Sequence, residues 1–274
     1  WGGGVTTQNR TGLTAGTYTV IVTDNAGCTA SNVTSVSEPS VISAVPFVTS
    51  VTCNGGNDGA VNLTVNGGNS PYSYNWGGGI TSQNRTSLAA GTYQVTITDY
   101  SSCTASASIV VNQANAISIT SVATDASCNG GNNGAISLTV NGGTAPYTYN
   151  WGGGITTQNR TNLVSGLYTV TVTDNATCTS LNSTTVNQAS AIAVSSTTTN
   201  VACNGGNNGS INLTISGGIS PYTFNWGGGI TTQNRTNLTA GSYTVTITDN
   251  ALCTTTHSAN VSQSTTITVN ATVT

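Results

Sequence analysis

Residues 91–99 read Gly91-Thr-Tyr-Gln-Val-Thr-Ile-Thr-Asp99, and this stretch decides the fold of the 274-residue chain. Tyr93, Val95 and Ile97 alternate with Gln and Thr, and a period of two is typical of a strand with one buried face. We therefore expect the three apolar side chains to face a core and the polar ones to face solvent. The pattern predicts β-structure, with a turn beginning at Asp99.

The sequence around this strand carries the same alternation. Segments rich in Gly and Asn interrupt it and predict turns at 54–59, 66–71 and 99–102. No segment shows helical periodicity. Roughly six or seven short strands per repeat, with a central Trp and a Tyr that follows Leu88-Ala-Ala-Gly91, predict an immunoglobulin-like β-sandwich with a tyrosine corner. The other alternating sets are Val61, Leu63 and Val65, then Tyr72, Tyr74 and Trp76, and then residues 104–112.

The whole pattern recurs every 75 residues, as Trp1, Trp76, Trp151 and Trp226 show. Identity between repeats extends to solvent-facing Thr and Asn, which indicates recent duplication and is typical of arrays whose product is length. Short linkers such as Gln113-Ala-Asn115 predict an elongated array of sandwich modules. We expect the C-terminal half of a truncated module at 1–38, complete immunoglobulin-like modules at 39–113, 114–188 and 189–263, and the first strand of a further module at 264–274.

Charge is unusually scarce: 4% of the residues are Asp, Glu, Lys or Arg, against about 25% in an ordinary globular domain. A net charge of −3 with widely separated arginines argues against a nucleic-acid partner, because phosphate binding needs clustered basic side chains. No apolar run approaches the roughly 18 residues that span a bilayer.

Catalytic and metal-binding side chains are equally scarce. His257 is the only histidine, so the modules at 39–113 and 114–188 contain no Ser-His-Asp or Cys-His site. No Cys-x-x-Cys pair is present to bind zinc. We expect no enzymatic activity, no catalytic residues, no metal site and no cofactor.

Two cysteines per repeat are expected to form disulfides, because a small secreted module has a small core and commonly adds a covalent link. The spacing leaves two pairings open. The favoured pairing joins the two cysteines of one module. Its geometry is unfavourable, because these cysteines lie at the first turn and at the last hairpin, which are at opposite ends of such a sandwich, and a disulfide needs Cα atoms within about 7 Å of each other. The other pairing joins cysteines of successive modules. Free thiols are a third alternative. The first pairing joins Cys53 to Cys103, Cys128 to Cys178 and Cys203 to Cys253; the second joins Cys28 to Cys53, Cys103 to Cys128 and Cys178 to Cys203.

Each module also has one arginine and an aspartate at its last hairpin. We favour a turn-capping role for the aspartate, because calcium usually takes more than one carboxylate. Calcium binding is the alternative, and a salt bridge from the arginine is a third. The residues concerned are Arg85 with Asp99, Arg160 with Asp174, and Arg235 with Asp249.

The aromatic residues of each module are expected to lie in the core, because the Trp is in phase with the alternating Tyr residues. Binding of a glycan on the Trp-Gly-Gly-Gly edge is the alternative. The expected core aromatics are Trp76, Tyr93, Trp151, Tyr168, Trp226 and Tyr243.

Three motifs in each module resemble the SprB-type repeat of gliding-motility adhesins. In one module they are Cys128-Asn-Gly-Gly-Asn-Asn-Gly134, Gly142-Gly-Thr-Ala-Pro-Tyr-Thr-Tyr-Asn-Trp151, and Leu163-Val-Ser-Gly-Leu-Tyr-Thr-Val-Thr-Val-Thr-Asp174 followed by Cys178. The resemblance covers the whole chain. It implies a very large bacterial cell-surface protein, exported by the type IX secretion system and used for gliding or attachment.

Two hypotheses for function follow. The first is a stiff stalk or filament made of structural repeats in a long extracellular adhesin or fibre, whose partners are neighbouring modules and other copies of the chain. The alternative is a set of adhesive repeats with one weak glycan or protein site per module. The first is favoured because no module has a cluster of unusual polar groups.

Overall fold

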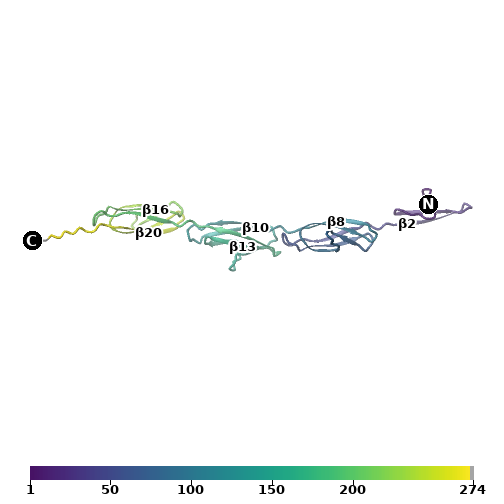
Figure 1. The fold of residues 1–274 in the computed structure, drawn as a ribbon, viewed down its shortest axis with the longest axis horizontal. Coiled ribbons are helices and arrows are strands. Elements are labelled where there is room, and N and C mark those ends of the chain that lie inside the picture. The colour runs from purple at the N-terminus through teal and green to yellow at the C-terminus, as the bar shows by residue number, and fades with distance from the viewer. Residues whose placement is uncertain (272–274) are drawn as a thin grey trace. The chain divides into compact units, whose positions relative to one another are not determined.

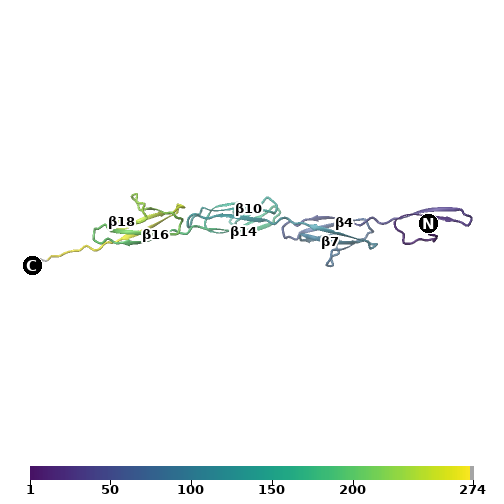
Figure 2. The same ribbon diagram turned by 90° about the horizontal axis from the view of Figure 1, so that it is seen from above.

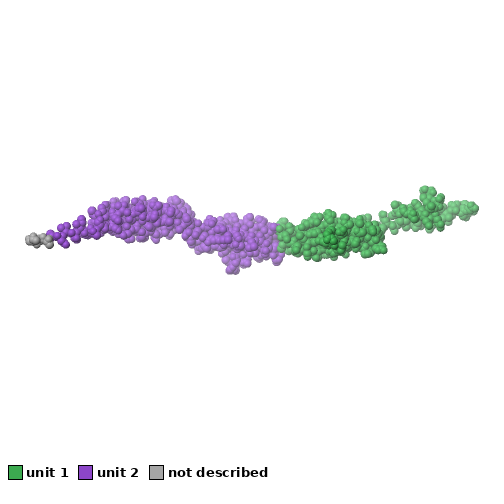
Figure 3. All heavy atoms as spheres, in the orientation of Figure 1, with its two compact units in different colours: residues 1–115 green, residues 116–274 purple. Residues whose placement is uncertain are grey.

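The computed structural model describes residues 1–271 and is all-β over that range, with twenty strands and no helix. This confirms the predicted fold class. The chain forms two compact units, residues 1–115 and the residues from Ala116 onward (Figure 3). Unit 1 contains the N-terminal residues and one complete module, and unit 2 contains two complete modules (Figure 1).

The module at 39–113 has two antiparallel sheets of three strands each. Figure 2 labels one strand of each sheet, β4 and β7. The first sheet has the order β3-β4-β6 and the second has the order β5-β7-β8. This arrangement of two packed sheets is that of an immunoglobulin-like sandwich. The strands are β3 (Ser43–Thr49), β4 (Gly59–Asn66), β5 (Ser73–Asn75), β6 (Arg85–Leu88), β7 (Gly91–Thr98) and β8 (Thr104–Val111).

The core lies between the two sheets and is made by the side chains that alternate inward. Val61 and Leu63 of β4 meet Val95 and Ile97 of β7, and all four are almost completely buried. Gln94, between the two β7 residues, is exposed. The alternation read from residues 91–99 is therefore confirmed.

The two complete modules of unit 2 repeat the same strand order. Each has its own core, centred on Ile136 and Val172 in one module and on Ile211 and Ile247 in the other. The first module has β9 (Ser118–Thr124), β10 (Gly134–Asn141), β11 (Thr148–Asn150), β12 (Arg160–Leu163), β13 (Gly166–Thr173) and β14 (Thr179–Val186). The second has β15 (Ala193–Thr199), β16 (Gly209–Ser216), β17 (Thr223–Asn225), β18 (Arg235–Leu238), β19 (Gly241–Thr248) and β20 (Thr254–Val261).

The first and last strands of a module run parallel to one another. In the module at 114–188, Ala126 and Gln188 form a parallel bridge, and the Ala126 N–H donates to the Asn187 carbonyl at 2.9 Å. Because these two strands run in the same direction, the chain enters a module at one end and leaves it at the other. This arrangement determines which turns lie at which end.

One glycine of the repeat is required by close packing. A Cβ at Gly134 would lie 2.6 Å from Cγ1 of Val186 and 2.8 Å from the Leu163 carbonyl oxygen. Real Cβ atoms do not approach so closely, so the last glycine of the Cys-Asn-Gly-Gly-Asn-x-Gly motif lets β12 and β14 pack against the start of β10.

Residues 1–38 contain only the hairpin of β1 (Gly16–Thr23) and β2 (Thr29–Val36). The strand expected over 264–274 is not formed in its described part, since residues 264–271 have no strand conformation. Its equivalents, such as β15, pair with the strand that follows them, and the described chain contains no such partner after residue 264. Residues 272–274 lie outside the described part.

Candidate functional site

The loop that follows the first strand of each module is tied to the residues that leave the module. We call residues 125–133 the cysteine loop. The Gly130 N–H donates to the Gln188 side-chain oxygen at 2.7 Å, and Nδ2 of Asn129 donates to the Ala189 carbonyl at 3.4 Å. The cysteine loop therefore lies at the end of the module where the chain leaves, and it positions Cys128 there.

The turn between the last two strands is organised by one carboxylate. We call residues 249–253 the aspartate turn. Oδ1 of Asp249 accepts the N–H groups of Ala251 and Cys253, both at 2.9 Å, and Oδ2 accepts the Ile219 N–H at 2.9 Å. Because Ile219 follows β16 in the other sheet, the carboxylate joins the two sheets as well as capping the turn. The aspartate turn lies at the end where the chain enters the module.

The hydrogen bonds to these carboxylates also set their ionisation. The Asn69 N–H lowers the pKa of Asp99 below the usual 3.8, with the turn N–H groups acting in the same direction. For Asp249, burial raises the pKa, but the N–H groups of Ile219, Cys253 and Ala251 outweigh it, so that this pKa is lowered too. Both carboxylates are buried and ionised at neutral pH.

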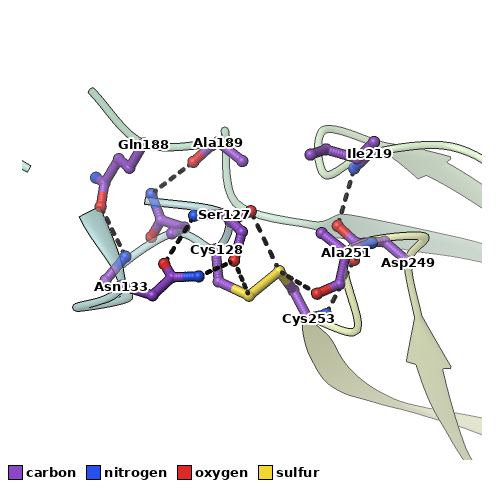
Figure 4. Close-up of a disulfide and its surroundings, with 11 residues drawn as sticks. Ser127, Cys128, Asn133, Gln188, Ala189, Ile219, Asp249, Ala251 and Cys253 are labelled. Carbon is purple, nitrogen blue, oxygen red and sulfur yellow. Dashed lines mark hydrogen bonds between the residues drawn. A yellow bond between two sulfur atoms is a disulfide. The ribbon is translucent and has the colours of Figure 1, made fainter. Parts of the chain in front are cut away.

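A disulfide joins the cysteine loop of one module to the aspartate turn of the next. Cys128 and Cys253 are bonded, with their Cα atoms 5.5 Å apart and a sequence separation of 125 residues (Figure 4). Around the bond, Ser127 N–H donates to Oδ1 of Asn133 and holds the loop in place. The cysteine loop of residues 125–133 and the aspartate turn of residues 249–253 thus meet at the junction of two consecutive modules.

Neither predicted pairing of these two cysteines is correct. Cys128 cannot reach Cys178, because the two cysteines lie at opposite ends of β14. Cys178 precedes the strand, whereas the cysteine loop is hydrogen-bonded to residues 187–189, which follow it, and the strand is about 25 Å long. Cys128 does not bond Cys103, whose thiol is free. The alternative of a link between modules was right in kind, but it joined Cys128 to Cys103 of the preceding module, whereas the bond is to Cys253 of the next module.

The other predicted disulfide cysteines divide into two groups. Cys53 and Cys178 are also disulfide-bonded. Cys28, Cys103 and Cys203 are free and exposed, which contradicts a Cys203–Cys253 or a Cys53–Cys103 bond.

The arginine of each module lies between two aromatic rings instead of beside the aspartate. The Arg85 guanidinium is 5.0 Å from the centre of the Tyr93 ring and 5.6 Å from that of Trp76. Arg160 and Arg235 repeat this arrangement. The carboxylate of Asp99 is engaged with backbone N–H groups, and the described residues show no ion pair between the two side chains.

The aromatic residues contribute to the core and also make polar contacts at its edge. Trp76 is 9% exposed, while Trp151 and Trp226 are half-buried. The Tyr93 hydroxyl donates to the carbonyl of Ala89, four residues upstream, at 2.9 Å. Tyr168 and Tyr243 make the same bond to Val164 and Thr239.

The Gln-Asn pair before each arginine has a function that was not predicted from the sequence. Oδ1 of Asn84 accepts the Leu63 N–H at 2.9 Å, and Nε2 of Gln83 donates to the Leu63 carbonyl at 2.6 Å. The two side chains thereby complete the backbone hydrogen bonding of β4 on the edge opposite β3, at a point that the pairing with β6 does not reach. The same bonds recur at Leu138 and Leu213. The only signal in the sequence was the repetition of Gln-Asn in every module.

The described residues contain no group of three or more His, Cys, Asp and Glu side chains that could hold a metal ion. Nor do residues 1–271 contain a helix long and apolar enough to cross a membrane. The most ordered polar features of each module are therefore its cysteine loop, its aspartate turn and the arginine that lies between the Trp and Tyr rings.

Three segments match the family model of the SprB repeat, namely residues 46–81, 120–156 and 195–231. Each lies within one complete module and extends from its first strand to the Trp-Gly-Gly-Gly turn. These segments of the chain are similar to the SprB repeat. Each match falls in a separate sandwich with its own core.

Similar solved structures are tandem arrays of immunoglobulin domains, at a distance too great to add to the fold assignment. Sidekick-1 immunoglobulin domains 1–5 are 12% identical with a TM-score of 0.36, over 91% of this chain and 66% of that one. Titin domains I67–I69 are 12% identical with a TM-score of 0.35, over 83% and 99%. An eight-domain structure of Down syndrome cell adhesion molecule matches over 92% of this chain but only 40% of its own, with a TM-score of 0.37. No curated protein matches the chain.

Proposed function

We propose that these SprB repeats form the stiff stalk of a very large bacterial cell-surface adhesin or fibre. Attachment or gliding would be performed by such a stalk after export by the type IX secretion system. One observation carries the proposal: consecutive modules of unit 2 are joined twice, once by the chain and once by the Cys128–Cys253 disulfide. Two separate covalent connections restrict bending and twisting at a junction far more than a linker alone.

The parallel first and last strands support the same function. Because the chain enters and leaves each module at opposite ends, every added module adds its length to the stalk. A module of this size contributes roughly 25–40 Å. Disulfides persist in oxidising surroundings, which fits a location at the cell surface.

Adhesive repeats with one glycan site per module are less well supported. A sugar would stack on the face of Trp151 or accept the indole N–H. The Arg160 guanidinium already lies over that ring, and the N–H already donates to the Thr157 carbonyl at 2.8 Å. Both groups that would hold a sugar are in use.

The test is to change the number of modules in the native surface protein and to measure the height of an epitope placed beyond the repeats. A stalk predicts that removal of one 75-residue module lowers the epitope by roughly 25–40 Å while surface attachment by the tip persists. A control deletes a segment of equal length outside the repeats. Loss of attachment in proportion to module number, at unchanged epitope height, would support adhesive repeats instead.

A further inference from the structure

Cys128 and Cys253, which are bonded to one another, lie directly beside the strands that enter and leave unit 2. Cys128 follows β9, the first strand of the first module, after a few residues of loop. Cys253 immediately precedes β20, the last strand of the second module. The disulfide thus connects the strand by which the chain enters this pair of modules to the strand by which it leaves.

This position gives tension a short covalent route. Force applied at residues 115 and 264 passes along β9 to Cys128, across the sulfur–sulfur bond to Cys253, and along β20. Both strands are already extended. Residues 129–252, which form most of two modules, lie off this route.

Without the disulfide, the same force would act on hydrogen bonds. In the first module it would pull the start of β9 away from the end of β14. These strands are parallel, so their contacts would be loaded in shear. The contacts include Ala126 N–H to the Asn187 carbonyl at 2.9 Å and Ala189 N–H to the Ala126 carbonyl at 3.3 Å. Their rupture would release the rest of the module.

We propose that the Cys128–Cys253 disulfide is a mechanical lock that carries tension past two SprB modules and prevents them from being pulled open. The inference depends on the proposed stalk only for its biological purpose. The lock itself is a property of the purified chain. It makes this part of the protein an inextensible tether while oxidised and an extensible one when reduced.

The size of the effect follows from the sequence separation. Opening the disulfide adds 125 residues to the covalent path, which is about 440 Å of extended chain. With the disulfide closed, only residues 115–128 and 253–264 remain in the path, about 80 Å when fully extended.

The experiment is single-molecule stretching of the full chain through handles attached at positions 115 and 264. Asn115 and Ser264 are each replaced by a residue whose side chain couples to the handle by a reaction that involves neither thiols nor amines, so that the cysteines stay as they are. With the disulfide closed, the distance between the two handles is expected never to exceed about 80 Å, so no unfolding step should lengthen the chain beyond that value. The Cys253→Ser variant is expected to unfold in steps that add about 440 Å. Cys203→Ser is the matched control, because it removes the free cysteine of the equivalent cysteine loop in the following module, and it is expected to behave as the native chain.

A second measurement does not depend on the folding of any variant. Dithiothreitol is added to the native chain while it is held folded at low force. For each disulfide that it opens, those of Cys53 and Cys178 included, the reagent supplies two electrons and two protons, leaves two thiols and becomes its own cyclic disulfide. The next pull is expected to reach the length of the Cys253→Ser variant. Equal extension before and after reduction, or a Cys203→Ser variant as extensible as Cys253→Ser, would overturn the proposal. The two proposals can fail separately. If the purified chain resists extension but the number of modules does not change epitope height on cells, the stalk is refuted and the mechanical lock is not.

Discussion

The hairpin β1–β2 and the hairpin β7–β8 have similar sequences and the same register, but only the second is part of a sandwich. Each pairs eight residues, from Gly16 with Val36 in one and from Gly91 with Val111 in the other. Burial separates them, since Val22 is 62% exposed while the equivalent Ile97 is 0% exposed. Strand pairing is thus encoded locally, whereas burial depends on the sheet formed by β3, β4 and β6.

The aspartates of the two hairpins show the same division. Oδ1 of Asp24 accepts the N–H groups of Ala26 and Cys28, as Oδ1 of Asp99 accepts that of Cys103. Only Asp99 also accepts an N–H from the other sheet, that of Asn69 at 2.9 Å. The carboxylate therefore caps its turn in both hairpins, and it joins two sheets only in the complete module.

The largest difference between the hairpins should come from their apolar residues. Ile97→Ala is expected to destabilise the module at 39–113 by about 2–5 kcal/mol, because it leaves a cavity between the sheets. Val22→Ala is expected to change stability by less than about 0.5 kcal/mol. Hydrogen exchange of peptides that cover β4 and β7 measures the first effect, and peptides that cover β1 measure the second. Equal effects would mean that the two hairpins do not differ in packing as described.

Asp99→Asn should have a smaller effect, and one that depends on pH. Because the pKa of Asp99 is lowered on folding, the carboxylate stabilises the fold above its usual pKa of 3.8, and this contribution is lost as the pH falls through the folded pKa. The melting temperature of the variant should therefore be below that of the native chain at pH 7. The difference should shrink as the pH falls below about 3.8 and vanish below the folded pKa of Asp99.

The control for this variant is Asp24→Asn, which removes a charge from a turn without an inter-sheet bond. It should lower stability less than Asp99→Asn at pH 7. A gap between native and Asp99→Asn chains that widens toward low pH would contradict the assigned role.

Tyr93→Phe is expected to cost about 1 kcal/mol, the usual contribution of one hydrogen bond between neutral groups. It removes the bond from the hydroxyl to the Ala89 carbonyl, which fixes the segment that leads from β6 into β7. Tyr18→Phe removes the equivalent bond to the Thr14 carbonyl, but should not affect the urea midpoint of the complete module. A shift of that midpoint by Tyr18→Phe would show that the two hairpins are coupled.

Arg85→Gln should have the smallest effect, about 0.5–1 kcal/mol from its contacts with two rings. Arg10 lies over one ring only, that of Tyr18 at 5.3 Å, so Arg10→Gln should cost less. Thermal unfolding followed by tryptophan fluorescence measures both. A loss for Arg85→Lys as large as for Arg85→Gln would assign the effect to the planar guanidinium and not to the charge.

The strands with a clear period of two were predictable from the sequence, and so was the repetition of the sandwich. β6 was not, because its four residues contain one buried side chain, Leu88, and four residues are too few to show a period. The position of Arg85 was missed because opposite charge suggested Asp99, whereas the backbone N–H groups of the turn had already satisfied that carboxylate.

The disulfide could not be derived from spacing. Its pairing depends on which end of a module each turn occupies and on which end of the neighbouring module it meets. The first fact was expected from the sandwich topology, in which the first turn and the last hairpin lie at opposite ends, and the parallel terminal strands confirm it. Which end of the neighbouring module each turn meets depends on how two modules are joined, and the sequence of one repeat does not contain that information.

The scarcity of basic side chains has a consequence for survival among proteases. A trypsin-like protease cuts after Lys or Arg, and this chain has no lysine and four arginines. In the complete modules each arginine begins a short strand and lies against two rings, so cleavage requires the side chain to leave its rings and the strand to leave its sheet. The complete modules therefore resist such enzymes for as long as they stay folded.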